Sequence, residues 1–346
     1  MKSFLSVKVK YCPMKKLALI PFENNPDKLY KCLELQYFDS EISGRGYRIV
    51  AYRNDNYLDV YDDYSLVYDK DEKFNIAENG LNKHIQTTLD NTIFQTEDGK
   101  LTLSFTFNDI ENREISFFIK EEINSKTKPI NLLAPVGFGS KNPEFMPLLF
   151  LYDFDFIRRK DTIVRCKIDN IDVEIDTFPM LMNFQRRYFT RYSENCELIE
   201  FINTDYSELE EVNLDNKLVF QKDNVAYRFE KENALKEILI MCKENETIIK
   251  FAPPLNITET MSGKFNIEPK SIYGHINGEF SVNRKEDIVE FNLRATDGWV
   301  PVPNSLISKI LFSKNSIFCR WTRNYDFKEV INLKTMETEG KWINNN

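Results

Sequence analysis

The feature that most constrains the fold of this chain is a repeated alternation of β-favouring runs with short polar turns. It is densest in residues 129–175, where a loop rich in proline and glycine precedes runs at residues 148–157, 162–168 and 171–175. Aromatic and β-branched residues fit a pleated, half-buried surface, and short polar turns join antiparallel neighbours. We therefore expect these three runs to form an antiparallel meander.

The same pattern extends over most of the chain. Residues 47–53 and 57–61 flank a turn at Asn54-Asp55-Asn56, which is typical of a hairpin. Residues 101–107 alternate apolar and hydroxyl side chains, and with residues 114–119 beyond a polar turn they predict a hairpin with one buried and one solvent-exposed face. Residues 76–89 show mixed helical spacing and predict one short helix. Further strands are expected at residues 114–119, 217–221, 225–230, 235–242, 247–252, 274–282, 288–293 and 317–323.

These runs predict an all-β, antiparallel protein with two barrel-like or sandwich-like domains packed together. A length of 346 residues is comfortable for two hydrophobic cores. The acidic and polar segment 203–216 is the best boundary, so we expect a first domain over residues 1–205, including the central loop, and a second over residues 206–346. Closing a sheet hides its edges, and an eight-stranded barrel is wide enough to hold one small ligand.

Charge and motif content exclude several function classes. The chain has 46 basic and 54 acidic residues with interspersed signs, which argues against a nucleic-acid partner. It contains neither GxGxxG nor GxxxxGK[ST], and its six scattered cysteines and two histidines offer no zinc spacing, so we expect no cofactor and no metal. No window approaches the ~18 apolar residues of a membrane span. The N-terminus lacks a continuous apolar segment, so we expect a cytoplasmic protein with reduced thiols.

Two carboxylates on one strand are the first candidates for catalysis. Asp153 and Asp155 are two residues apart in a β-favouring run, so they should share one face while Tyr152 points to the other. Such a pair faces solvent, pairs with a cation such as Arg158 or Arg187, or lines a cavity as an acid–base pair with one raised pKa. In a further alternative, the opposite face of this strand, which carries Tyr152 and other aromatic residues, lines the cavity and the aspartates lie outside it.

The histidines restrict the chemistry further. His275 lies in an expected strand, where it is either a structural histidine or a proton donor and acceptor facing a cavity. Neither His275 nor His84 lies in a recognisable nucleophile motif such as GxSxG.

Two segments supply candidate ligand-binding residues. Residues 184–192 combine aromatic rings with fixed cations, and Arg187, Tyr188 and Tyr192 there would either line an apolar pocket or lie where a sheet folds over its rim. Residues 294–303 contain Arg294 and Trp299; the tryptophan is either a plug for a barrel or a platform for a ligand.

Several of these segments resemble a known family. The strand arrays around a proline-rich crossover, GHINGEFSV at 274–282, RATDGWVPVP at 294–303 and FCRWTR at 318–323 are similar to the two-domain lipocalin-like proteins that include carotenoid hydratases and related cyclases. The resemblance extends over residues 45–340 as a general pattern of strands and turns, and it includes no catalytic motif. It implies two lipocalin-like domains and an apolar guest.

We therefore expect a soluble protein that binds a hydrophobic or amphipathic small molecule in a barrel cavity, either as a binder alone or as an isomerase, cyclase or hydratase. The alternative is a carbohydrate-binding or carbohydrate-active β-protein, in which exposed aromatic rings stack on sugars and a carboxylate pair serves hydrolysis. A third interpretation is an interaction module with filled interiors and a large exposed apolar patch.

Overall fold

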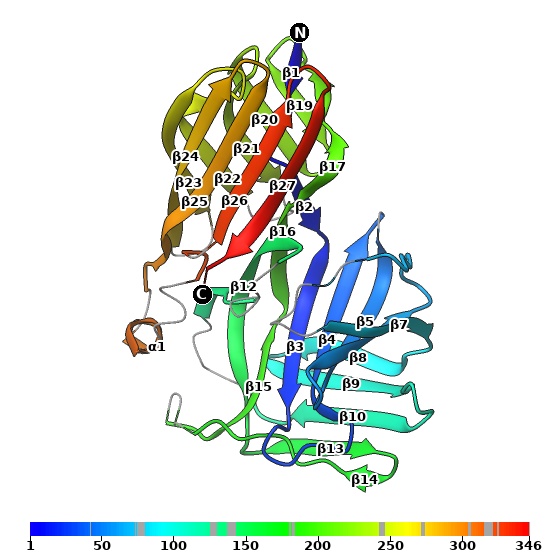
Figure 1. The fold of residues 1–346 in the computed structure, drawn as a ribbon. Coiled ribbons are helices and arrows are strands. Elements are labelled where there is room, and N and C mark those ends of the chain that lie inside the picture. The colour runs from blue at the N-terminus through cyan, green and yellow to red at the C-terminus, as the bar shows by residue number, and fades with distance from the viewer. Residues whose placement is uncertain are drawn as a thin grey trace.

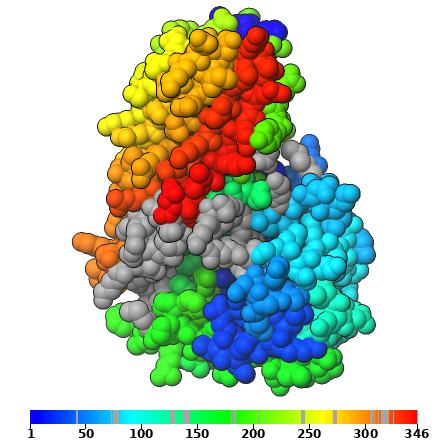
Figure 2. Space-filling model, in the orientation of Figure 1, coloured from blue at the N-terminus to red at the C-terminus, as the bar shows by residue number. Residues whose placement is uncertain are grey.

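The computed structural model describes a chain that is almost entirely β-structure, as the sequence predicts. The described strands form four sheets, and the helix α1 (Leu306–Lys314) follows the longest C-terminal strands. Figure 1 shows an N-terminal half and a C-terminal half stacked end to end, and the same two bodies are visible in Figure 2. The structure describes residues 1–41, 43–72, 74, 80–124, 130–136, 143–179, 181, 184–241, 246–270, 274–303, 306–314, 321–323 and 325–345.

The N-terminal half is built on a large sheet with the strand order β2-β16-β12-β15-β3-β4-β5-β6-β7, to which β11 is added beside β12. Its described pairings are antiparallel except that of β6 with β7, which is parallel. The strands are β2 (Val9–Cys12), β3 (Met14–Pro21), β4 (Tyr30–Ser40), β5 (Gly44–Arg53), β6 (Tyr57–Asp63), β7 (Gly80–Thr87), β11 (Ile130–Ala134), β12 (Phe145–Arg158), β15 (Arg187–Ser193) and β16 (Asn195–Ile202).

A five-stranded sheet with the order β14-β13-β10-β9-β8 packs against part of this large sheet. The core between them joins residues of β3 to β6 with residues of the smaller sheet, so this region is a sandwich. Phe105 and Phe117 stack there with ring centroids 5.3 Å apart. The strands are β8 (Asp90–Glu97), β9 (Lys100–Asn108), β10 (Glu114–Glu121), β13 (Thr162–Ile168) and β14 (Ile171–Asp172).

The C-terminal half is one antiparallel ten-stranded sheet that curves into a half-barrel, with the order β17-β27-β26-β25-β24-β23-β22-β21-β20-β19. Most neighbours in it are consecutive in sequence, as short polar turns require. Its strands are β17 (Thr204–Glu208), β19 (Val219–Lys222), β20 (Val225–Lys231), β21 (Ala234–Met241), β22 (Glu246–Leu255), β23 (Met261–Pro269), β24 (Gly274–Lys285), β25 (Ile288–Pro301), β26 (Tyr325–Asn332) and β27 (Glu337–Asn344).

The N-terminal segment of the chain links the two halves, because its first two strands pair in different halves. The N-terminal strand β1 (Lys2–Phe4) pairs with β18 (Glu211–Asn213), so the chain starts at the far end of the C-terminal half and enters the N-terminal half through β2. One hydrophobic cluster runs from Leu17 and Phe150 into the half-barrel at Phe251 and Trp342. The expected boundary at residue 205 falls inside β17, and the division into two domains stays a prediction.

Three local expectations need correction. The short helix expected at residues 76–89 is wrong for residues 80–87, which form β7; residues 76–79 lie outside the described part. The expected meander is confirmed for its last two runs, since β13 pairs antiparallel with β14, but it is wrong for the first, since β12 pairs with β11, β15 and β16 and β13 pairs with β10 in the other sheet. Of the strand expected at residues 317–323, the described residues 321–323 form a turn. A short turn between two runs does not reveal that the chain changes sheets. Within the described residues, no helix is long and apolar enough to cross a membrane.

The sandwich core predicts a stability effect. Phe105 is fully buried, whereas Phe184 is 99% exposed. Replacing Phe105 with alanine should lower the free energy of unfolding by about 3–5 kcal/mol, because the transfer term and the cavity term add. The matched Phe184→Ala change should stay within about 0.5 kcal/mol. Urea unfolding followed by circular dichroism measures both, and equal losses would contradict the assignment of this core.

Candidate functional site

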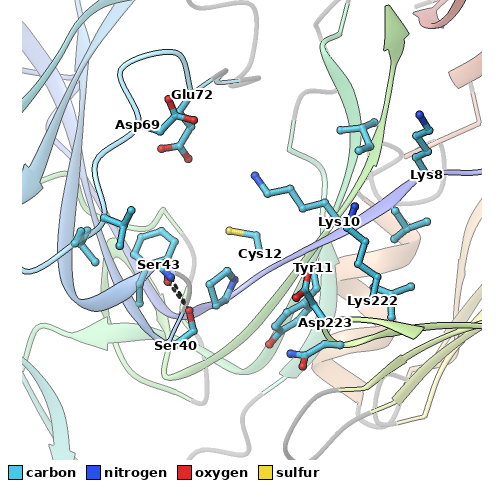
Figure 3. A pocket seen from close by; sticks show the side chains of 18 of the residues that line it. Lys8, Lys10, Tyr11, Cys12, Ser40, Ser43, Asp69, Glu72, Lys222 and Asp223 are labelled. Carbon is cyan, nitrogen blue, oxygen red and sulfur yellow. Dashed lines mark hydrogen bonds between the residues drawn. The ribbon is translucent and has the colours of Figure 1, made fainter. Parts of the chain in front are cut away.

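A cavity of about 460 Å³, here called the outer chamber, lies between the two halves. Strand β2 and the residues before it form one wall, residues 38–72 of the N-terminal half form a second, and residues 222–227 of the C-terminal half form a third. In Figure 3, Lys10 and Cys12 point from β2 into the space that Asp69 and Glu72 border on the other side. The site therefore takes its walls from segments more than 200 residues apart in sequence.

A smaller cavity of about 110 Å³, here called the inner chamber, adjoins the outer one. The two chambers share four lining residues: Cys12, Phe38, Arg48 and Glu72. The inner chamber extends between β3, β4 and β5 on one side and β12 and β16 on the other. Its apolar wall is made of Met14, Leu17, Phe38, Phe74, Val136, Phe145, Pro147, Leu149 and Leu198.

The central strands of the large sheet place polar side chains in this chamber because both of their faces are covered. Along β4, Leu33 and Leu35 point into the sandwich core, and the alternating Glu34 and Gln36 point to the opposite face. In the β4–β5 register Gln36 lies opposite Arg48. The face that would be solvated in a simple sandwich is thus covered by β12, β16, residues 66–72 and Phe74.

Arg48 is the centre of the polar wall. Its Nε and Nη2 donate to the two carboxylate oxygens of Asp62 at 2.5 and 2.8 Å, and its Nη1 and Nη2 donate to those of Glu72 at 2.9 and 2.6 Å. The rings of Phe38 and Phe74 lie 5.2 and 5.1 Å from the guanidinium carbon. Such bidentate pairs are among the strongest hydrogen bonds in proteins, and cation–π contacts add to them.

Asp62, Glu72 and His84 bring potential metal-ligating atoms within 4.8 Å of one another. Both carboxylates are already engaged by Arg48, and His84 Nε2 lies 2.8 Å from Asp62 Oδ2. Burial alone would raise the pKa of Asp62, but hydrogen bonds from Arg48 and His84 outweigh it and hold that pKa below its usual value. A metal ion would have to displace a guanidinium, so we interpret this group as an ion-pair network.

Glu34 is a buried carboxylate with neutral partners. Gln36 Nε2 donates to Glu34 Oε1 at 2.6 Å, and the Tyr52 hydroxyl donates to Oε2 at 3.0 Å. Burial raises the pKa of Glu34 above its usual value, although both hydrogen bonds act in the opposite direction. Burial also raises the pKa of Tyr52, so that the hydroxyl stays protonated and remains a donor.

Glu200 and Cys12 border the chamber from β16 and β2. Burial raises the pKa of Glu200, and its nearest cation is Lys10, with Nζ 3.7 Å from Oε2. Burial also raises the pKa of the Cys12 thiol, to about 12. Because the thiolate is the nucleophilic form, Cys12 is poorly suited to covalent catalysis at neutral pH.

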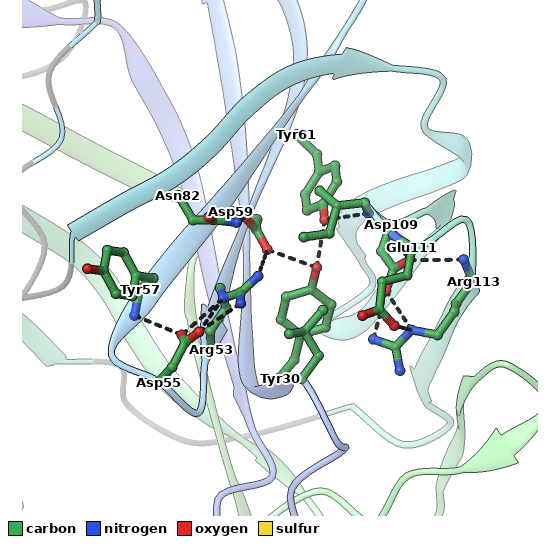
Figure 4. Close-up of polar contacts among 12 residues, drawn as sticks. Tyr30, Arg53, Asp55, Tyr57, Asp59, Tyr61, Asn82, Asp109, Glu111 and Arg113 are labelled. Atoms are coloured by element: carbon green, nitrogen blue, oxygen red, sulfur yellow. Dashed lines mark hydrogen bonds and ion pairs between the residues drawn. The ribbon is translucent and has the colours of Figure 1, made fainter.

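A second polar cluster lies at the edge of the sandwich (Figure 4). The Tyr30 hydroxyl donates to the fully buried Asp59 at 3.1 Å and lies 2.7 Å from the Tyr61 hydroxyl. Arg53 and Asn82 donate to Asp59 at 3.2 and 2.7 Å. Tyr30, Asp59 and Tyr61 are fully buried and satisfy one another, while Asn82 closes the cluster from an exposed position, which is the pattern of a structural network.

The structure does not place Asp153 and Asp155 on one face, so that expectation is wrong. Asp153 has a left-handed φ of 55° and is exposed, because the strand is irregular opposite β11. Asp155 is buried; it accepts a hydrogen bond from the backbone N–H of Phe156 at 2.8 Å, and its Oδ2 lies 3.9 Å from Arg187 Nη1. Neither carboxylate lines the outer or the inner chamber.

Three other predicted residues are engaged in the interior of the N-terminal half. The Tyr152 hydroxyl donates to Glu197 at 2.9 Å, and Arg158 Nε donates to Glu121 at 3.1 Å. Arg187 is 1% exposed and donates to the carbonyl of Phe156 at 2.6 Å. These side chains hold strands together and do not border either chamber.

The remaining predicted residues are scattered. Tyr188 and Tyr192 are half-buried on β15, and burial raises the pKa of Tyr192. His275 is half-buried on β24, and the Arg294 side chain is 66% exposed with Nε 3.3 Å from Asp326. Trp299 is buried edge-on against Phe312, with ring centroids 5.1 Å apart. None of the five lines the chambers between the halves.

Sequence reasoning missed Glu34, Arg48, Glu72 and Glu200. The one available signal was a charged residue amid apolar neighbours in β4 and β5, which a strand with a wetted face shows equally well. Comparison of the chain with protein-family models, curated proteins and solved structures finds no match. The geometry of the chambers therefore carries the functional argument.

The Arg48 network predicts a large and specific loss of stability. Replacing Arg48 with methionine keeps the apolar stem but leaves Asp62 and Glu72 without their cation, which should cost about 3–5 kcal/mol. Arg228 pairs with Glu237 at 2.7 Å on the surface, with about half of its side chain exposed. Arg228→Met should cost less than about 1 kcal/mol. Urea unfolding at pH 7 compares the two, and similar losses would contradict the central role of Arg48.

Glu34 predicts a pH-dependent effect of a neutral substitution. Its raised folded-state pKa means that the stability it contributes is present at low pH and is lost as pH rises through that pKa. Glu34→Gln should therefore be more stable than the wild type at pH 8, with the difference shrinking towards pH 5. The exposed Glu290→Gln variant is the control and should show no such trend. Denaturant midpoints across this range measure both, and a pH-independent difference for Glu34→Gln would contradict the prediction.

Proposed function

We propose that this protein binds an amphipathic small molecule in the chambers between its two halves. The observation that carries the proposal is the outer chamber itself. Its volume of about 460 Å³ lies within the ~300–1,000 Å³ range of small-molecule sites. Small-molecule sites are typically concave and mostly apolar, with a few polar groups that fix the orientation of the ligand.

The walls of the outer chamber suit an apolar body. Leu5, Val9, Leu66 and Val225 are buried around it, and the Tyr227 hydroxyl accepts a hydrogen bond from the backbone N–H of Val9 at 3.2 Å. That bond fixes β20 of the C-terminal half against β2.

Charged side chains lie at the rim of the same chamber. Lys8 and Lys222 flank Glu210, with N–O distances of 3.9 and 4.0 Å. The chamber thus combines an apolar interior with a polar opening, which favours a ligand that has both characters.

Binding, and not catalysis, is the function that this geometry supports. Asp153, Asp155 and His275 lie away from both chambers, and the Cys12 thiol is protonated at neutral pH. The isomerase, cyclase or hydratase chemistry expected from the sequence gains no support from these positions. The proposal includes two lipocalin-like domains, which the curved C-terminal sheet supports. It also includes a cytoplasmic location, which is supported by the free thiols of Cys12, Cys32, Cys166 and Cys196.

The carbohydrate alternative has a candidate surface but lacks a stacking platform. A hollow of about 670 Å³ on the C-terminal sheet is lined by Glu268, Glu279 and Asp297 together with Asn266 and Asn277. The aromatic residue that lines it, Phe265, is only 3% exposed. Sugar binding relies on exposed rings as well as polar groups, so we favour the amphipathic ligand.

Native mass spectrometry of protein purified from its own host, followed by lipid extraction, tests the proposal. We expect a co-purifying amphipathic molecule that is lost when the outer chamber is filled. Val67 lines that chamber and is 62% exposed, so Val67→Trp should block the opening without disturbing the core.

The matched control is Val330→Trp, on an exposed position of β26 outside the chambers. It should retain the co-purifying molecule. Equal occupancy in both variants, or an empty wild-type protein that also fails to bind any of a panel of lipids, would overturn the proposal.

A further inference from the structure

The inner chamber holds more carboxylates than cations. Glu34, Glu72 and Glu200 line it, whereas Arg48 is the only arginine or lysine among its described lining residues. Arg48 pairs with Glu72 and with Asp62 behind it, each through two hydrogen bonds. Its single positive charge is therefore shared by two carboxylates, and Glu34 and Glu200 receive no hydrogen bond from it.

The surroundings of Glu34 and Glu200 confirm this imbalance. In the described part of the chain, no lysine, arginine or histidine nitrogen lies within 4.0 Å of Glu34, whose partners are the neutral Gln36 and Tyr52. Among the described residues, the cation paired with Glu200 is Lys10, at 3.7 Å, and that lysine side chain is 58% exposed. The charge of Arg191 lowers the pKa of Glu34 from a distance, but Arg191 lies across Leu19 from Glu34 and stacks on Phe189.

The same wall already shows how it holds a cation. The rings of Phe38 and Phe74 lie 5.2 and 5.1 Å from the guanidinium carbon of Arg48, and the carboxylates of Asp62 and Glu72 pair with its N–H groups. Phe38, Phe74, Tyr52 and Phe145 also line the inner chamber. Aromatic faces and carboxylates together are the means by which proteins bind organic ammonium groups.

We infer that the inner chamber takes the ammonium group of an amphipathic organic cation whose apolar body lies in the outer chamber. This inference rests on the proposed function and specifies the ligand's head group. The volume of about 110 Å³ exceeds the ~30 Å³ share of one water molecule, so a small head group has room. The shared residues Cys12, Phe38, Arg48 and Glu72 mark the passage between head and body.

An anionic head group fits this chamber poorly. Four of the five N–H groups of Arg48 already donate to Asp62 and Glu72, and a carboxylate or sulfate would lie beside Glu34 and Glu200. Like charges in a buried site repel strongly because the local dielectric is low. A neutral hydroxyl head would gain hydrogen bonds but no charge pairing.

Isothermal titration calorimetry at pH 8 with three octyl compounds tests the inference. Octyltrimethylammonium, 1-octanol and octanoate share one apolar body and differ in head-group charge. We expect the ammonium compound to bind about tenfold or more tightly than octanol, and octanoate to bind weakest. Octanoate binding as tightly as the ammonium compound would overturn the inference while leaving the proposed function intact. Failure of all three to bind would overturn both.

Two isosteric variants locate the preference. In Glu34→Gln the amide oxygen still accepts from Tyr52, and the bond to Gln36 is kept when the Gln36 amide flips so that its oxygen accepts from the new NH2 group; Glu200→Gln removes the second charge. Each should reduce the ammonium-to-octanol affinity ratio several-fold while octanol binding, which also reports folding, is retained. The exposed Glu290→Gln variant changes net charge equally and should leave the ratio unchanged. An unchanged ratio in both chamber variants would overturn the inference, and either variant alone suffices if the other does not fold.

Discussion

The burial of Arg48 between Asp62 and Glu72 is the interaction on which the functional part of this structure depends. It joins β5 and β6 to residues 66–72, part of the segment that closes over the outer face of the large sheet. A charged group can be buried there because two carboxylates pair with the guanidinium and the rings of Phe38 and Phe74 lie 5.2 and 5.1 Å from its carbon. With this network in place, a sheet face that would otherwise be solvated becomes the wall of two chambers.

The chambers also depend on how the chain connects the two halves. Strand β2 pairs with β16 in the N-terminal half, while β1 before it pairs with β18 beside the C-terminal sheet. The first strands therefore span the junction, and the hydrogen bond from Val9 to Tyr227 fixes its spacing. Because one hydrophobic cluster continues through the junction, the outer chamber has walls from both halves. The ligand site thus lies between the sheets and outside the half-barrel interior that the sequence suggested.

Sequence reasoning predicted much of the secondary structure and little of the site. The hairpins β5–β6 and β9–β10 are confirmed because alternation and turn residues are local signals. Asp153 and Asp155 were misplaced because a single left-handed residue interrupts the alternation of β12, and the sequence gives no sign of it. Glu34 was missed because a charged residue in a strand normally indicates a wetted face. Only the packing of β12 and β16 over β4, a contact between distant segments, reveals that this face is buried.

Photoaffinity labelling tests the central claim, that the ligand lies between the two halves, most directly. An octylammonium probe carrying a terminal diazirine would be photolysed on the intact protein, and the modified peptides would be mapped by mass spectrometry. The chamber geometry predicts labels on β2 and residues 66–69 together with residues 222–227, because these segments face one space. Labels confined to the interior of the C-terminal sheet, or to one half alone, would contradict the account.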